Sequence, residues 1–233
     1  MRKVVSEIDC MRVDGDDRQK IRETIAVESQ MQLIVNDEVV TEFLYSAGLD
    51  EELVVGYLIS SGRISGLKSI EKTDMGDKVA RVILSEEESD RLPVKDLGIT
   101  VSHRQLLEIR SKLMESQRNH RATRGFHGAI IWELSTGKWL ACEDIGRHNA
   151  VDKVIGFALK NNYNLSQSMV LLSGRLISDI VSKCRNCGIP LMASMTVATD
   201  GGIKHGVESN MTIIGALSED GFWLYNEGAV RIT

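Results

Sequence analysis

Two short segments combine a glycine with an arginine where a strand is expected to end and a helix to begin. The first is residues 143–156, EDIGRHNAVDKVIG, and the second contains Ser173-Gly174-Arg175. The N–H groups of a first helical turn have no partner inside the helix, and together with the helix dipole they attract anions. Arginine adds a planar fork of donors that fits phosphate or carboxylate oxygens. Two such turns on consecutive units favour a phosphate-bearing ligand.

The residues expected to contact this ligand lie in and around the two turns. Gly146 permits a close backbone approach, and His148 and Asp152 are four residues apart on one helix face, where they could hydrogen-bond. His127 stands at a junction between a loop and a strand. The candidate binding residues are Gly146, Arg147, His148, Asn149, Asp152, Lys153, Ser173, Gly174, Arg175 and His127. The structural alternative is that Ser173 caps a helix and that each arginine pairs with a nearby acid.

The elements that must position these residues alternate between strand and helix in the second part of the chain. Strands are predicted at residues 129–133, 139–142, 168–172, 191–196, 211–217 and 222–225, and helices at 102–120, 150–160 and 176–187. A hairpin followed by two strand–helix units on one sheet indicates a three-layer α/β architecture. Ligands usually bind such sheets at the carboxyl ends of the strands. Residues 200–205 are interpreted as a polar loop near that end.

The first part of the chain is predicted to be a small α+β unit. Residues 31–40 indicate two strands around a turn at Asn36-Asp37, residues 49–59 a helix and residues 79–84 another strand. An acidic turn at 85–90 follows, and the composition changes at Pro93. We therefore predict an N-terminal α+β domain over 1–95 and an α/β domain over 96–233.

Composition and charge exclude several classes of protein. The 233-residue chain has 42% hydrophobic residues, which suits a soluble globular protein. Its formal net charge of -5 argues against binding nucleic acid through overall electrostatic attraction. No apolar run approaches the length of a membrane span. Four unevenly spaced cysteines do not make a secreted disulfide framework. A cytoplasmic protein is expected, without nucleic acid or membrane as a partner.

Cys184 and Cys187 form a CxxC pair, which can indicate a redox or metal site. Their spacing places both on the apolar stripe of the helix at 176–187, and a second cysteine pair is lacking, so we interpret them as core residues and expect no bound metal. The order of elements also resembles the cytidine-deaminase fold. Zinc deaminases need a His-x-Glu and a Pro-Cys-x-x-Cys at two helix starts. Residues 148–150 and 173–175 lack these groups, so deaminase chemistry is not supported.

The run DIGRHNAVDK at 144–153 resembles the signature of the formate dehydrogenase accessory protein family (FdhD/NarQ). Further similarity lies in the SGR turn at 173–175 followed by GIP at 188–190, and in residues 33–64 and 123–127. The resemblance implies a cytidine-deaminase-like main domain, a small N-terminal domain and a homodimer. It also implies a role in maturing the molybdenum or tungsten bis-guanine-dinucleotide cofactor of formate dehydrogenase, with sulfur taken from a cysteine desulfurase. The expected ligand is molybdopterin guanine dinucleotide or a GDP-like molecule.

One departure from this family bears on the chemistry. The family's sulfur-carrying cysteines lie in a loop before the long helix, whereas residues 92–105 here hold no cysteine. Sulfur transfer needs a thiolate nucleophile, so transfer by the usual residues is not expected. Cys142, on the strand that leads into the first turn, is the remaining catalytic candidate.

Three alternatives to cofactor maturation stay open. The first is a sulfurtransferase that uses Cys142 or the CxxC pair, and the second is a non-catalytic module that senses a nucleotide or a partner. A zinc hydrolase ranks last. Whether the protein is an enzyme is therefore undecided, while a formate dehydrogenase-type molybdoenzyme remains the expected partner.

Overall fold

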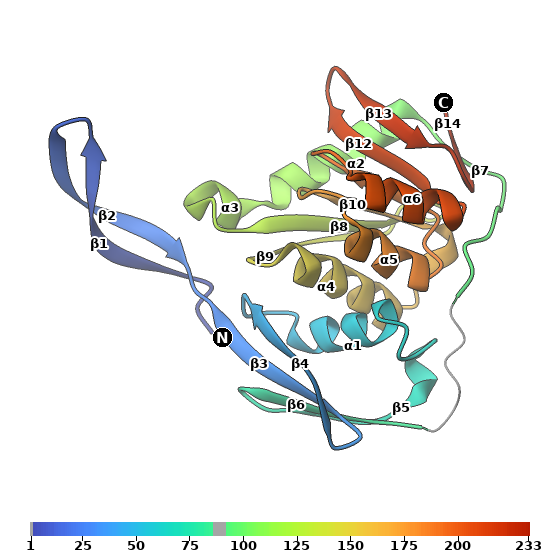
Figure 1. Ribbon diagram of the computed structural model, residues 1–233, viewed down its shortest axis with the longest axis horizontal. Helices are drawn as coiled ribbons and strands as arrows, with labels where there is room; N and C mark the ends of the chain where they lie inside the picture. The colour runs from blue at the N-terminus through green and yellow to red at the C-terminus, as the bar shows by residue number, and fades with distance from the viewer. Residues whose placement is uncertain (1, 86–91) are drawn as a thin grey trace.

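A six-stranded sheet forms the centre of the second part of the molecule (Figure 1). The computed structural model describes residues 2–85 and 92–233. The strand order is β13-β12-β11-β10-β8-β9, with β10, β11 and β12 parallel and the other pairings antiparallel. The strands are β8 (His127–Glu133), β9 (Trp139–Asp144), β10 (Ser168–Leu172), β11 (Leu191–Ser194), β12 (Thr212–Ser218) and β13 (Gly221–Asn226). The mixed α/β architecture predicted from the alternating pattern is confirmed.

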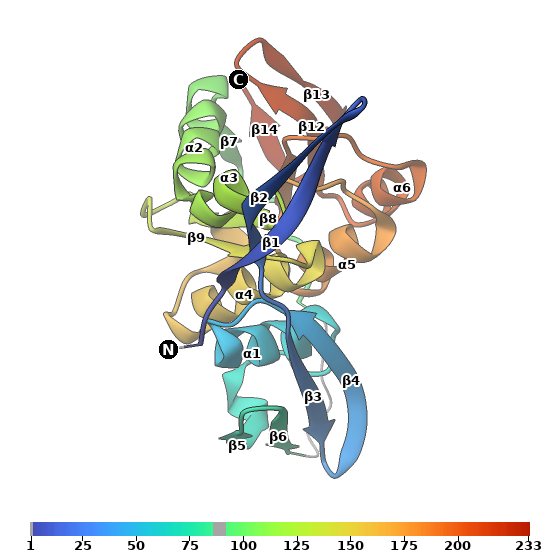
Figure 2. The ribbon, with the colours of Figure 1, turned by 90° about the vertical axis from the view of Figure 1, so that its left-hand side faces the viewer.

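Helices cover both faces of this sheet (Figures 1 and 2). Ala129 and Ile131 of β8 belong to the core that contains α4, while Ile130 belongs to the core that contains α2. This alternation follows from the two-residue period of a strand. The covering helices are α2 (His103–Ser116), α3 (Arg118–Thr123), α4 (Arg147–Lys160), α5 (Ser178–Asn186) and α6 (Asp200–Glu208). A short parallel pair, β7 (Ile99–Val101) with β14 (Val230–Ile232), lies beside α2.

A second sheet is formed by the first part of the chain. It has the order β4-β3-β6-β5, and helix α1 (Asp50–Ser60) connects β4 to the rest of the unit. Asn36 and Asp37 both have positive φ, 47° and 66°, as a two-residue hairpin turn requires. The strands are β3 (Ser29–Val35), β4 (Glu38–Tyr45), β5 (Ile70–Met75) and β6 (Val79–Leu84). Single 3₁₀ turns occur at η1 (Leu67–Ser69) and η2 (Leu165–Gln167).

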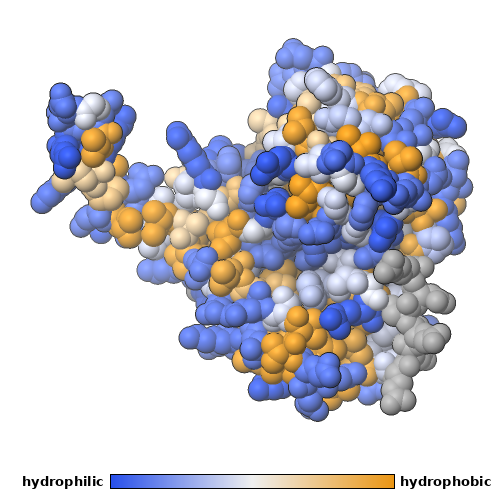
Figure 3. All heavy atoms as spheres, in the orientation of Figure 1, coloured by the Kyte–Doolittle hydropathy of each residue, from blue (hydrophilic) through white to orange (hydrophobic). Residues whose placement is uncertain are grey.

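A long hairpin at residues 5–26, which we call the arm, was not predicted. Strands β1 (Val5–Asp14) and β2 (Asp17–Ala26) pair along their whole length and project away from the body (Figure 1). Figure 3 shows that the far end of the arm stands clear of the rest of the molecule and that the arm carries apolar as well as polar residues. Its sequence is too rich in charged residues to show the alternation of a half-buried strand.

Two other expectations needed correction. The helix expected at 102–120 ends at Ser116, because Gln117 leaves helical geometry, and α3 begins anew at Arg118. Ser102 caps α2 in a reciprocal capping box with Gln105. The polar loop expected at 200–205 is wrong, because these residues lie in α6, whose first turn is capped by Thr199 through Gly202 N–H. Of the expected acidic turn at 85–90, residues 86–90 lie outside the described residues.

Helices α1 and α4 cross at two glycines, and this crossing joins the two sheets. A Cβ atom on Gly56 would lie 1.8 Å from the carbonyl oxygen of Asp152, and one on Gly156 would lie 1.9 Å from that of Glu52. Apolar residues from both sides of the crossing, such as Leu53 and Val154, belong to one continuous core. The boundary near residue 95 stays a prediction. Within the described residues, each helix is too short or too polar to cross a membrane.

We expect Gly56→Ala and Gly156→Ala each to lower the free energy of unfolding by about 1–3 kcal/mol or more, because the added methyl group overpacks a backbone contact. Urea denaturation followed by circular dichroism measures this. Gly66→Ala is the matched control, since a Cβ there meets nothing within 4 Å and the backbone is extended. Equal stability of Gly56→Ala and Gly66→Ala would contradict the proposed tight crossing.

Candidate functional site

The two glycine–arginine turns meet at one edge of the central sheet, where β9, β10 and β11 end and β8 begins. His127 at the start of β8 pairs with Asp144 at the end of β9. A Cβ atom on Gly174 would lie 3.3 Å from Arg147 Cδ and 3.5 Å from His127 Nδ1. The structure therefore brings together Gly146, Arg147, His127, Ser173 and Gly174, which we call the edge cluster.

The first turn has the predicted form. Helix α4 starts at Arg147 directly after Gly146, and no side chain among the described residues caps it. The N–H of Gly146 donates to Asp144 Oδ1 over 2.8 Å. The side chain of Asn149 has a structural role, because its amide donates hydrogen bonds to Leu44 O and to the same Asp144 oxygen. The N-terminal end of α4 is thus left without a capping side chain, as an anion site requires.

The second turn differs from the prediction. Ser173 and Gly174 do not head a helix, since α5 begins only at Ser178 and Arg175 lies exposed before it. Ser173 is also no helix cap. Its Oγ accepts from Gly128 N–H and its own N–H donates to Gly128 O, both over 2.9 Å. Ser173 therefore fastens the turn to β8.

Ser194, at the end of β11, is a site residue that sequence reasoning missed. Its hydroxyl donates to the carbonyl oxygen of Gly174 over 2.7 Å and accepts from Thr196 N–H. A small hydroxyl directly after a buried strand is the signal that could have identified it. Ser194 holds the backbone of the second turn in place.

The guanidinium of Arg147 has an unused donor at this edge. Its Nε atom is buried and has no hydrogen-bond partner among the described residues. A buried donor without an acceptor costs free energy comparable to a lost hydrogen bond. An anion bound between Arg147 and Gly174 would supply that acceptor.

The pKa values of two histidines reflect the burial and the charges of the site. Burial lowers the pKa of His127, and the nearby charge of Arg147 lowers it further. Burial also lowers the pKa of His148, with added contributions from Lys183 and Arg147. Both rings therefore favour the neutral form in a positive local potential, and a bound anion would raise both pKa values.

Lys153, expected to contact the ligand, is instead part of a buried ion pair. Its Nζ lies 2.6 Å from Asp144 Oδ2 and donates to Ser46 O over 2.7 Å. Only 1% of Lys153 is exposed. Direct ligand contact by this side chain does not agree with its position, because α1 and β4 cover that face of α4.

Asp152 is likewise buried, on the same face of α4. It accepts from Lys183 Nζ over 2.8 Å and from Ser60 Oγ over 2.6 Å. Lys183 and Ser60 thus occupy the carboxylate that was expected to hydrogen-bond with His148. Asp152 is 1% exposed, so it too is removed from the ligand surface.

The three cysteines of the body are surrounded by protein in a way that opposes formation of the thiolate. Burial raises the pKa of the Cys142 thiol to about 12, and Cys142 Sγ donates to Ala150 O. Burial also raises the pKa of Cys184 and of Cys187, and both lie in the core as predicted. The described residues include no group of three or more His, Cys, Asp and Glu side chains that could hold a metal ion.

Comparison with known proteins gives the family. The model of the FdhD/NarQ family matches residues 80–233. The chain belongs to the FdhD/NarQ family. Among its relatives in this family are Protein FdhD of Methanocaldococcus jannaschii, 32% identical over 97% of this chain and 98% of the relative, and Sulfur carrier protein FdhD of Sulfolobus acidocaldarius, 26% identical over 95% and 96%.

A solved structure shares the fold of this FdhD/NarQ member. It is the crystal structure of a protein assigned as a formate dehydrogenase accessory protein from Desulfotalea psychrophila. The TM-score is 0.85 at 24% identity, over 96% of this chain and 97% of the other. Both sheets therefore belong to the shared architecture.

We expect Asp144→Asn to lower the free energy of unfolding by about 3–5 kcal/mol, because the ammonium of Lys153 would be left buried without its counterion. Chemical denaturation measures the loss. Glu7→Gln, which breaks an exposed pair with Arg22 on the arm, is the control and should cost less than about 1 kcal/mol. Similar losses in the two variants would show that the buried pair does not stabilise the fold.

Of the four cysteines, we expect only Cys10 on the arm to react with iodoacetamide in the folded protein near neutral pH. The raised pKa values of Cys142, Cys184 and Cys187 leave few thiolates at these positions. Peptide mass spectrometry locates the label, and denatured protein labelled at all four positions is the control. Rapid alkylation of Cys142 in the folded state would contradict this expectation.

Proposed function

We propose that this FdhD/NarQ member binds molybdopterin guanine dinucleotide, or another ligand with a guanosine diphosphate moiety, at the edge cluster. The observation that supports the proposal most directly is the buried, unpartnered Nε of Arg147 beside Gly174 and His127. The N-terminus of α4 and the exposed Arg175 add positive potential at the same edge.

The acids near the edge cluster do not oppose such a ligand. Asp144 is paired with Lys153, and Glu143 accepts from the backbone N–H groups of Asn119 and His120 at the start of α3. Burial is the main cause of the lowered pKa values of His127 and His148, and the charge of Arg147 lowers both further. A pyrophosphate group fits this charge and the close backbone approach at Gly174.

We further propose that the protein assists the maturation of a formate dehydrogenase-type molybdoenzyme. The names of its relatives support this role, since several are sulfur carrier proteins and the structural neighbour is assigned as a formate dehydrogenase accessory protein. The bound group would supply the molybdenum or tungsten chemistry to the client enzyme, while Arg147, Gly174 and the first turn of α4 would hold and orient it. A homodimer and a cysteine desulfurase partner stay predictions.

Sulfur transfer is proposed to be absent from the usual region of the chain. Residues 92–105 hold no cysteine, and the raised thiol pKa values of Cys142, Cys184 and Cys187 oppose nucleophilic attack. If guanine nucleotides bind but no molybdoenzyme depends on the protein, the non-catalytic sensing module becomes the better description.

Calorimetric titration with GDP tests the site. We expect wild-type protein to bind GDP and Arg147→Ala to bind at least about ten-fold more weakly, because a charge-assisted hydrogen bond is lost. Arg104→Ala is the matched control, since Arg104 is exposed on α2 at the other face of the sheet. Unchanged affinity in Arg147→Ala would refute the site assignment.

A further inference from the structure

The ring of His127 lies next to Arg147 and has no hydrogen-bond partner among the described residues. His127 opens β8, and its Nδ1 lies 3.5 Å from the Cβ position on Gly174, which itself lies 3.3 Å from Arg147 Cδ. The unpartnered Nε of Arg147 is at the same place. A ligand between Gly174 and Arg147 would therefore meet an imidazole whose two nitrogens are both available.

Two other histidines of the chain have partners within the protein. His120 Nδ1 lies 2.6 Å from the carbonyl oxygen of Phe126, to which only a protonated nitrogen can donate. His205 Nδ1 lies 2.7 Å from Ser182 Oγ. His127 differs from both, because no such contact fixes the positions of its protons, and its protonation state can follow the ligand.

The charged groups that face His127 come from three elements. Arg147 of α4 and His120 of α3 disfavour a charge on the ring, while Asp144 of β9 favours one. The carboxylate of Asp144 is already paired with Lys153, and its contribution is the smallest of the three. The charges around His127 therefore add to the effect of burial, and together they keep the ring neutral in the free protein.

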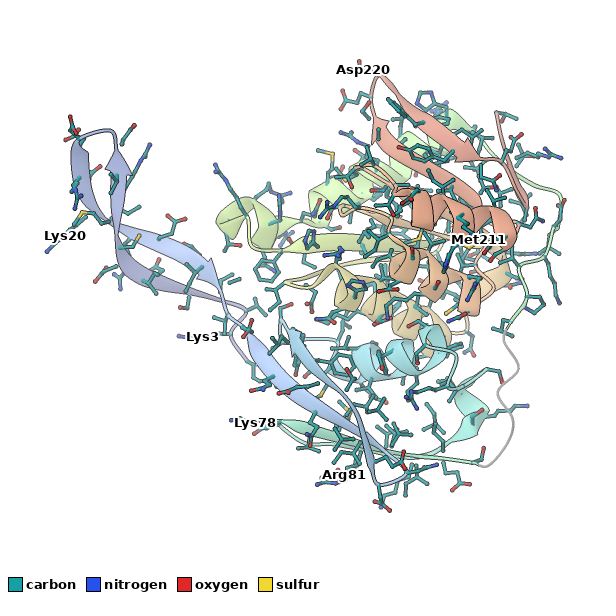
Figure 4. The ribbon with its side chains drawn as sticks, viewed as in Figure 1. Lys3, Lys20, Lys78, Arg81, Met211 and Asp220 are labelled. Carbon is teal, nitrogen blue, oxygen red and sulfur yellow. The ribbon has the colours of Figure 1, made fainter. Side chains whose placement is uncertain are left out.

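Other parts of the chain add little charge near this ring. The turn after β10 faces it with Gly174, which is uncharged. Lys20 lies on the arm away from the body, and Asp220 lies at the turn between β12 and β13 (Figure 4). Both side chains are exposed, so water and salt screen them. A bound ligand is thus the main source of new charge at His127.

A bound oxyanion would change the preferred form of the imidazole. A neutral ring has one N–H donor and one lone pair, and a lone pair turned toward phosphate oxygens repels them. Protonation makes both nitrogens donors and adds a positive charge beside the ligand. The imidazolium form therefore complements an anion held by Arg147, whereas the free protein favours the neutral ring.

We propose that His127 is a proton-linked contact of the edge cluster, which takes up a proton when a phosphate group binds beside Arg147 and releases it when that group leaves. The inference rests on the proposed function and adds the regulation of its site. Lower pH then favours loading and higher pH favours release, because the bound ligand and the bound proton stabilise each other.

The direction of the pH effect follows from the two states of the ring. The pKa of His127 is lowered in the free protein, and a bound anion raises it. Affinity therefore falls as pH rises from the lower of these pKa values to the higher, by up to about ten-fold per pH unit. The second ionisation of a phosphate, at about pH 6, acts in the opposite direction, because the fully ionised group binds a cationic site more tightly.

Calorimetry with GDP between about pH 6 and pH 8 tests the inference. We expect the affinity of wild-type protein to fall about ten-fold over this range, with uptake of about half a proton near pH 7, measured in two buffers of different ionisation enthalpy. His127→Asn should lose at least about half of that uptake. His205→Asn is the matched control, because Ser182 already holds its ring, and it should match wild type.

The remaining outcomes separate the inference from the proposed function. GDP binding without proton uptake overturns the inference and leaves the proposed function standing. Uptake in His127→Asn above half of the wild-type level also overturns it, since another group, such as His148, would then be the source. If GDP does not bind to wild-type protein at any of these pH values, the proposed function fails and the inference fails with it.

Nuclear magnetic resonance gives an independent readout in the wild-type protein. The chain has five histidines, few enough for their ring signals to be resolved and assigned. Titration of the His127 signal should give a higher pKa with saturating GDP than without it. An unchanged or lower pKa would overturn the inference even where His127→Asn loses affinity through a change in folding.

Discussion

The buried pair between Lys153 and Asp144 is the interaction on which the site depends. Both side chains are removed from water, and such charges are tolerated only when each is paired and hydrogen-bonded. Asp144 meets this requirement by also accepting from Gly146 N–H, Asn149 and Ser46. One carboxylate thus ties the end of β9, the first turn of α4 and the end of β4 together, and the position of Arg147 follows from it.

A second set of contacts also fixes α4. Asp152 binds Lys183 of α5 and Ser60 of α1, and the Gly56–Gly156 crossing brings α1 and α4 into backbone contact. Helix α4 is therefore held between the central sheet on one face and α1 on the other. The N-terminal unit thus positions the helix that carries the candidate anion site.

Sequence patterns could identify the edge cluster but not all of its neighbours. Val151 and Val154 recur at helical spacing and are buried against the sheet, and Gly146-Arg147 follows a strand, so local pattern sufficed for both. Asp152 and Lys153 could not be assigned in this way. A charge at a helix start is compatible with a ligand surface or with a buried pair, and the partner Ser46 lies 107 positions away from Lys153. Only the tertiary contact decides between them.

The arm and α6 were missed for different physical reasons. Ribbon β1–β2 is exposed on both faces, so no core imposes a period on its side chains. Helix α6 contains Gly202 and Gly206, which disfavour a helix by propensity but allow close approach to Leu176 and Ile213. In both cases the local sequence signal is weak. The contacts that favour α6 come from residues outside that segment, and the arm has no core contacts that would impose a pattern on its side chains.

Residues 92–98, which include no cysteine, lie at the far end of α5 from the edge cluster. Leu92 bridges to Cys187 at the C-terminal end of α5, and Pro93 lies against Gly188. The edge cluster lies before the N-terminal end of the same helix, and nine helical residues separate the two ends by about 13 Å. Residues 92–98 therefore lie away from the contacts of Arg147, Gly174 and Ser194. The candidate anion site and this cysteine-free segment are therefore held by different parts of the chain, because they lie at opposite ends of α5.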